Sequence, residues 1–123
     1  MAAYETLGQR VSLIAGADLT DKMYHFVKVD STGKAVLPAA ATDAIVGVSY
    51  QPAKEGEADT VIVSGIARVI AGAAIVAGDP VAGDTSGAAV KATGSVGYGI
   101  ALTAGAKGEQ VAVLLKTVGV VNA

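Results

Sequence analysis

Several residue types that often carry chemistry are scarce or missing in this 123-residue sequence. It contains no cysteine and no tryptophan, and it has one phenylalanine and one histidine. Without cysteine there is no disulfide, no thiolate nucleophile and no cysteine-ligated zinc. His25 is the single imidazole, so a histidine-based metal site would lack a second such ligand and a catalytic triad would have no choice of base. We therefore expect no metal site and no catalytic triad.

Charge is also sparse along the sequence. Nine Lys and Arg residues stand against eleven Asp and Glu residues, which gives a formal net charge of −2. Because the basic residues are scattered singly, they form no stripe that could follow a phosphate backbone. We expect no nucleic-acid partner.

Long apolar runs are absent as well, although 52% of the residues are hydrophobic. No uncharged apolar run reaches the roughly 18 to 20 residues that a membrane-spanning helix needs. The start of the sequence carries Glu5 and lacks the basic and apolar regions of a secretory signal. We expect no membrane partner, and synthesis in a cytoplasm.

What the sequence does contain is an internal repeat of turn and strand residues. Three blocks recur in the same order, and they are residues 30–36 with 84–90, 46–56 with 98–108, and 61–63 with 111–113. The shifts are 54 (84 − 30), 52 (98 − 46) and 50 (111 − 61) residues. A supersecondary unit used twice explains such a series. The sequence therefore predicts two related repeats, residues 26–69 and 79–116.

Short β-branched and aromatic runs, separated by glycine-bearing turns, fill the chain after residue 22. Roughly nine or ten such runs at a spacing of about 8 to 12 residues are typical of a small barrel or sandwich. The expected strands are residues 24–29, 34–37, 45–50, 60–64, 66–70, 88–92, 96–103 and 110–117. We predict an all-β fold of short antiparallel strands, built from two related halves, in one domain.

The N-terminal residues 1–21 show no sustained period, and two interpretations are open. They form an arm that orders against another surface, or residues 10–15 form a first strand that pairs with the chain's own sheet. In the predicted organisation, residues 1–21 are an N-terminal arm, residues 22–117 are the β domain and residues 118–123 are a C-terminal tail.

Asp30 and Asp84, on related halves of an all-β chain, invite comparison with the paired carboxylates of aspartic proteases. Those enzymes place glycine two residues after the acid, so that two carboxylates share one proton. Both copies here read Asp-x-x-Gly, which is the spacing of an ordinary turn. The sequence also lacks the Gly-x-Ser-x-Gly and Gly-x-Gly-x-x-Gly motifs. We expect no catalytic residue, no cofactor and no enzymatic activity.

The second repeat and its turns resemble a known family. The matching segments are residues 78–81 (GDPV), 87–92 (GAAVKA), 96–102 (VGYGIAL) and 104–113 (AGAKGEQVAV). Their order resembles the capsid decoration, or cement, proteins of tailed bacteriophages, well over residues 60–117 and weakly over residues 22–59. The resemblance implies a β-rich structural protein that binds the outside of an assembled head, commonly as a homotrimer, and stabilises the capsid.

The same resemblance implies a partner and a location. The partner is the major capsid protein, and the protein belongs to the exterior of the capsid in the virion after synthesis in the host cytoplasm. An arm that adds a strand to a capsid edge would supply main-chain hydrogen bonds with little sequence demand. Our hypothesis is that five residues contact the shell or a neighbouring subunit: Tyr4, Leu7, Arg10, Val11 and Leu13. On this hypothesis, deletion of residues 1–14 abolishes binding and leaves the remainder folded.

Two alternative functions would use a similar scaffold. The chain could be a structural subunit that assembles by itself, as a fibre base or a surface array. It could also be a biotinyl-like or lipoyl-like carrier domain. Such carriers present a modified lysine at an exposed hairpin tip, and Lys91 would be the candidate, although it lacks the usual Met or Asp neighbours.

Overall fold

The structure, a computed structural model, describes residues 5–40 and 43–121. Its strands are β1 (Thr6–Leu7), β2 (Arg10–Ile14), β3 (Phe26–Val29), β4 (Ala35–Val36), β5 (Gly47–Ser49), β6 (Ala58–Ile62), β7 (Gly65–Ile70), β8 (Pro80–Gly83), β9 (Ala89–Lys91), β10 (Ser95–Val96), β11 (Gly99–Ala101), β12 (Gln110–Leu115) and β13 (Val120–Val121). No helix in the described part of the chain has the length and apolar character needed to cross a membrane.

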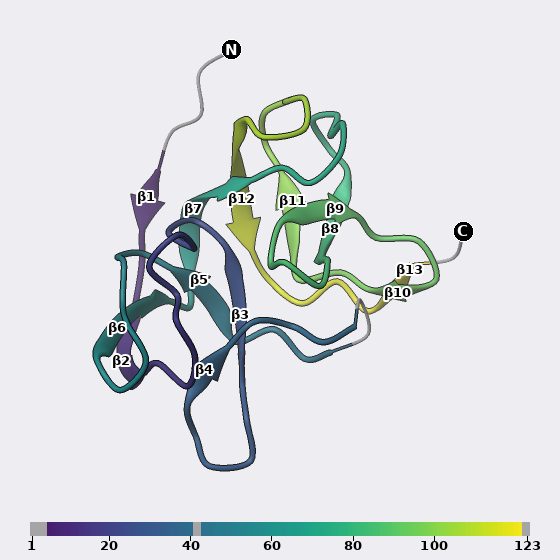
Figure 1. The fold of residues 1–123 in the computed structure, drawn as a ribbon. Coiled ribbons are helices and arrows are strands. Elements are labelled where there is room, and N and C mark those ends of the chain that lie inside the picture. Colours follow the sequence, from purple (N-terminus) through teal and green to yellow (C-terminus); the bar gives the residue numbers. More distant parts are fainter. Residues whose placement is uncertain (1–4, 41–42, 122–123) are drawn as a thin grey trace.

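The strands form two larger antiparallel sheets and one small one (Figure 1). Sheet A has the order β1-β7-β12-β11-β8-β9, and sheet B has the order β2-β6-β5-β3-β4. The third sheet is the pair β10 and β13. Residues 96–103, predicted as one strand, divide between β10 and β11. The prediction of an all-β fold of short antiparallel strands is confirmed.

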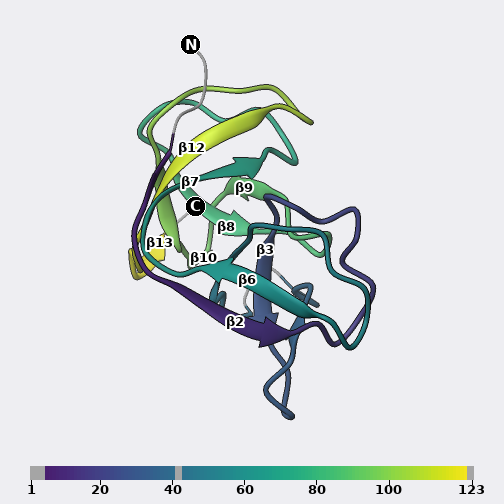
Figure 2. The same cartoon turned by 90° about the vertical axis from the view of Figure 1, so that its left-hand side faces the viewer.

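Sheets A and B are built on the same plan. If β1 is set aside, the order β7-β12-β11-β8-β9 corresponds strand for strand to β2-β6-β5-β3-β4. The registers agree as well, because the cross-strand row Phe26, Val48, Ile62 corresponds to the row Pro80, Ile100, Leu114. Figure 2 shows sheet A above sheet B. We call residues 10–62 half 1 and residues 66–114 half 2.

The two halves differ in their bounds from the repeat read in the sequence. The predicted first repeat, residues 26–69, includes β7, whereas the strand pairing makes β7 the first strand of half 2 and β2 its counterpart. Residues 10–14 pair with β6, so they follow the second interpretation of the N-terminal region, as a strand of the chain's own sheet. The alignment of the third repeated block also changes. Val61 corresponds to Val113, at a shift of 52 (113 − 61), whereas the sequence comparison aligned this block at a shift of 50.

Each half carries the same aspartate-capped turn between its second and third strands. In both turns the aspartate Oδ1 accepts three hydrogen bonds of 2.7 to 3.0 Å. Two come from the backbone N–H and the side-chain hydroxyl of the residue two positions later, and the third comes from the backbone N–H of the residue four positions later. Gly33 and Gly87 have φ angles of 84° and 82°, which glycine adopts without strain. Asp30 and Asp84 therefore cap turns, as their spacing predicts.

The main core lies where one half packs into the other. Phe26, Val48 and Ile62 are fully buried and share one cluster with Ala67 and Val69 of sheet A. In half 1 we call the face that carries the odd-numbered residues of β2 the inner face, and in half 2 the face that carries the odd-numbered residues of β7. The opposite face of each half is its outer face. The outer face of half 1 thus packs against the inner face of half 2.

The inner face of sheet B has a separate, smaller cluster. Its buried members are Ala15, Leu19, Val27, Ala35, Ala53 and Val61, with Leu13, Leu37 and Val63 packed against them. Leu19 and Ala53 come from loops, which are joined by a hydrogen bond of 2.8 Å from Leu19 N to Ala53 O. The loops therefore cover part of this face.

The packing of half 1 into half 2 predicts that Ile62→Ala strongly destabilises the protein. Ile62 is fully buried, and removing such a side chain from a core costs about 2 to 5 kcal/mol. The matched control is Val76→Ala, because Val76 is 64% exposed and should cost less than about 1 kcal/mol. Urea denaturation measures both free energies of unfolding, and equal losses would contradict the packing described.

Candidate functional site

The predicted contact residues lie on the first two strands. Leu7, in β1, is partly buried against the main core. Arg10, Val11 and Leu13 lie on β2, where Val11 is 41% exposed and Leu13 packs against the smaller cluster. Tyr4 lies outside the described residues. The structure thus brings Arg10, Val11 and Leu13 together on one strand and places Leu7 in the other sheet.

The N-terminal segment connects the two sheets. β1 pairs with β7 in sheet A, and β2 pairs with β6 in sheet B. Where the chain crosses, Gly8 N donates to Ser64 O at 3.1 Å and Val63 N donates to Gln9 O at 3.0 Å. A Cβ atom on Gly8 would lie 2.9 Å from the backbone oxygen of Ser64, so this approach requires glycine. The segment therefore ties half 1 to half 2.

β2 forms one edge of sheet B, and no other strand of the described residues pairs with its outer side. Ala15 N donates to Glu57 O at 2.8 Å, so the odd-numbered residues direct their main-chain groups to the β6 side. The N–H and C=O groups of Arg10, Ser12 and Ile14 therefore point to the open edge. In half 2 the corresponding side of β7 is covered by β1. Such an edge is a template for an added strand.

A polar and aromatic cluster, which the sequence did not point to, lies where sheet B meets β1 and β7. Arg68 Nη2 donates to Glu5 Oε1 at 2.6 Å and to Tyr24 Oη at 3.0 Å, and its Cζ lies 4.9 Å from the Tyr24 ring centroid. The hydrogen bond to Glu5 raises the pKa of Arg68. Tyr24 meets Tyr50 edge to face at 6.1 Å, and Arg10 Cζ lies 6.0 Å from the Tyr50 ring. The cluster fixes the start of β1 through Arg68 and Glu5, and it reaches β2 through Arg10.

Half 1 also contains a buried polar pair. Ser49 Oγ lies 3.0 and 2.9 Å from the two carboxylate oxygens of Asp59, and both residues are fully buried. Burial raises the pKa of Asp59. The corresponding positions in half 2 are Ala101 and Val111, which pack in the core without a polar group. The fold of a half therefore does not require a carboxyl group at this position.

The remaining residues singled out in the sequence have local roles. His25 Nδ1 lies 3.0 Å from Met23 O, and burial lowers the pKa of His25. Lys91 lies within β9, not at a hairpin tip, and its Nζ is 3.9 Å from Asp79 Oδ1. In residues 5–40 and 43–121, no three His, Cys, Asp or Glu side chains gather closely enough to hold a metal ion.

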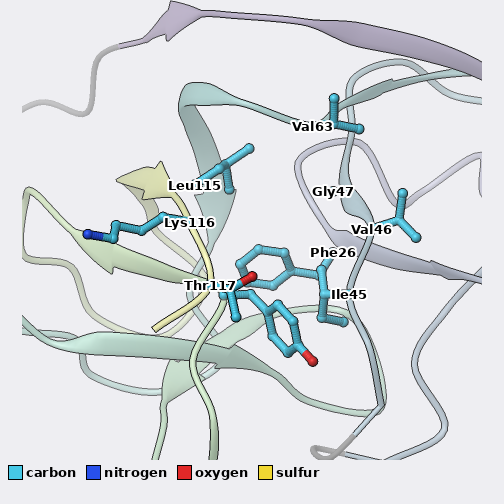
Figure 3. A pocket seen from close by; sticks show the side chains of 9 residues that line it. Phe26, Ile45, Val46, Gly47, Val63, Leu115, Lys116 and Thr117 are labelled. Atoms are coloured by element: carbon cyan, nitrogen blue, oxygen red, sulfur yellow. The ribbon is translucent and has the colours of Figure 1, made fainter. Parts of the chain in front are cut away.

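A shallow pocket opens where the two halves meet (Figure 3). The lining residues are Phe26, Ile45, Val46, Gly47, Val63, Tyr98, Leu115, Lys116 and Thr117. They provide one amine, one phenol and one aliphatic hydroxyl, but no carboxylate or imidazole. These groups do not form a nucleophile paired with a base and its orienting partner.

Comparisons with known proteins agree with a structural role. The family model described as phage cement protein matches residues 8–117. Among solved structures, the head fiber gp8.5 N base in bacteriophage phi29 is similar, with a TM-score of 0.69 and 18% sequence identity, over 88% of this chain and 93% of that chain. At that identity the likeness concerns the fold. No curated protein matches this sequence.

The raised pKa of Asp59 predicts a specific dependence of stability on pH. Because the folded state holds the proton more tightly than the unfolded state does, the stability from the protonated form is present at low pH and is lost as pH rises through the folded pKa. Asp59→Asn cannot ionise, so the variant should gain stability relative to the wild type between pH 4 and pH 7.

Urea denaturation of both proteins at the two pH values measures this difference. The other carboxylates are common to both proteins, so their effects cancel to first order. A difference between wild type and variant that stays constant with pH, or that shifts in favour of the wild type as pH rises, would contradict the prediction.

Proposed function

The chain belongs to the phage cement protein family, and from this membership we propose that it binds the outer surface of an assembled phage head and stabilises the capsid. The resemblance read in the sequence is confirmed by the family match, and the protein is a capsid-associated structural component of a phage. The proposed partner is the major capsid protein, and the proposed location is the capsid exterior, reached after synthesis in the host cytoplasm.

The observation that carries the proposal is the open edge of β2. β1 already adds to the corresponding side of β7 through the register Thr6 to Ile66 and Leu7 to Gly65. A strand of the capsid protein can add to β2 in the same way, through the main-chain groups of Arg10, Ser12 and Ile14. Strand addition gives affinity through main-chain hydrogen bonds and needs few particular side chains. Arg10 and Val11, both exposed on β2, would provide side-chain contacts.

Weak individual contacts are sufficient for such a protein. Linked binding sites raise the effective concentration of each one, so an oligomer on a regular shell binds far more tightly than a single chain does. We include a homotrimer in the proposal because a trimeric protein matches local three-fold positions of a shell.

A second candidate function is a self-assembling fibre base. It is favoured by one observation, the similarity in fold to a head fibre base of bacteriophage phi29. The two functions separate in solution, because a fibre subunit assembles with no shell present and a cement protein needs the shell for its ordered array.

Blocking the edge of β2 should weaken binding to heads. Ser12→Pro removes an N–H that points away from β6, and proline is tolerated on the free side of an edge strand. Losing one or two main-chain hydrogen bonds should weaken binding by about tenfold. Cosedimentation with purified heads of a phage that encodes the chain measures the effect.

Ser12→Ala is the matched control, because it removes the same hydroxyl and keeps the N–H. Far-UV circular dichroism establishes that both variants fold. Equal binding of the two variants and the wild type would rule out strand addition at this edge. Deletion of residues 1–14 is a less selective test, because it removes β1 from sheet A and β2 from sheet B.

A further inference from the structure

The turn between β3 and β4, residues 30–34, projects from half 1 beyond the body of the molecule (Figures 1 and 2). We call it the open turn, and we call its counterpart in half 2, residues 84–88, the docked turn. We propose that the open turn is a second contact with the major capsid protein, so that half 1 faces the shell through both this turn and the edge of β2. The inference rests on the proposed function and adds a contact surface to it.

The docked turn shows what a turn of this kind can bind. It packs against half 1, where Phe26 N, at the start of β3, donates to Gly87 O at 2.7 Å. A Cβ on Gly87 would lie 2.6 Å from Phe26 O, and a Cβ on Gly83, just before the turn, would lie 3.4 Å from Phe26 Cβ. The docked turn therefore accepts a main-chain N–H from the end of a strand and packs closely against that strand.

The open turn has the same internal hydrogen bonds but is uncovered. Gly33 is exposed, whereas its counterpart Gly87 is buried. Lys34 is also exposed, whereas its counterpart Ala88 is 5% exposed, and Val29, just before the turn, is 37% exposed. A Cβ on Gly33 would meet nothing within 4 Å, and no main-chain N–H of the described residues donates to Gly33 O. The surface that half 2 uses for docking is thus available in half 1.

A second copy of this chain does not offer the site that the docked turn uses. In half 1 that site is the N–H of Phe26, which is already bonded to the chain's own Gly87, and Phe26 is fully buried. In half 2 the corresponding residue is Pro80, and proline has no N–H to donate. The partner of the open turn is therefore a different protein, and in the proposed function that protein is the major capsid protein.

The open turn adjoins the proposed capsid contact on β2. The chain leaves β2 through Ala15, which forms a bridge with Ala35, and Gly16 N then donates to Ala35 O at 2.8 Å. A Cβ on Gly16 would lie 3.0 Å from Lys34 Cβ and 3.2 Å from Asp30 Oδ2. The end of β2 therefore lies against the base of the open turn, so one region of the capsid protein can contact both.

The residues of the open turn indicate what the capsid protein must present. Gly33 O can accept an N–H from the end of a strand, as Gly87 O does, and Val29 adds an apolar contact. The three ion pairs found within residues 5–40 and 43–121 do not include Lys34, so its amine can pair with a carboxylate of the partner. The expected partner site is a strand end with an available N–H beside an acidic side chain.

Lys34→Ala tests the predicted carboxylate partner. The variant gives the open turn the residue that the docked turn already has, so the turn should keep its structure. Losing one exposed ion pair per copy should weaken binding to heads about threefold and reduce its dependence on salt. Lys107→Ala is the matched control, because it removes the same charge from the exposed loop between β11 and β12, at the opposite end of Figure 1. Equal binding of the two variants at every salt concentration would overturn the predicted carboxylate.

Site-specific cross-linking identifies the protein that the open turn contacts. Because the chain has no cysteine, Thr32→Cys introduces a unique thiol in the open turn, and Ser86→Cys introduces one at the counterpart position of the docked turn. The two positions are matched, because both side chains are exposed and both bond the aspartate of their turn. With a photoreactive maleimide attached, Thr32→Cys bound to heads should cross-link to the major capsid protein, and Ser86→Cys should not. Cross-linking of Thr32→Cys to another copy of this chain, or no more cross-linking than at Ser86→Cys, would overturn the inference.

The same heads separate failure of this inference from failure of the proposed function. If the wild type binds, Ser12→Pro binds more weakly and Thr32→Cys gives no cross-link to the capsid protein, the edge of β2 remains the contact and only the open turn is excluded. If the wild type does not bind heads at all, the proposed function and this inference are both overturned.

Discussion

Packing of the outer face of half 1 against the inner face of half 2 is the interaction on which the structure depends. Phe26, Val48 and Ile62 of half 1 are fully buried in a core that otherwise consists largely of Ala and Val. Neither sheet has enough aromatic residues to fill a thick interior of its own. Apolar area is therefore removed from water mainly where the two halves meet. The N-terminal segment strengthens this junction because it pairs with both sheets.

This arrangement leaves the two ends of the molecule unlike each other. The outer face of half 1 is buried against half 2, whereas Leu114 on the corresponding face of half 2 is 37% exposed. The first strand of half 1, β2, has an open side, whereas β1 covers the corresponding side of β7 in half 2. A chain made of two halves that packed symmetrically would have covered corresponding faces equally. Because the outer face of half 1 packs on the inner face of half 2, corresponding faces of the two halves are covered differently. The open edge of β2 suits a structural protein that binds a neighbouring surface.

The local features were predictable from the sequence, and the long-range ones were not. Asp30 and Asp84 act within their own turns, so their spacing to the following glycine was sufficient to predict the turns. The sequence did contain a sign that β2 and β7 are equivalent, because residues 14–16 and 70–72 both read Ile-Ala-Gly. The predicted repeats did not use this match, since they were aligned on the three other blocks. Ile62 and Leu114 look alike in sequence, and only the packing distinguishes them. Glu5 and Arg68 are separated by 63 positions, so no local pattern connects them.

The most direct measurement is an electron cryomicroscopy map of phage heads incubated with this protein. We expect ordered density on the outer surface of the shell, with the edge of β2 against the capsid protein. Density inside the shell, or a protein attached to the capsid through the β8–β9 turn with β2 facing solvent, would contradict the account.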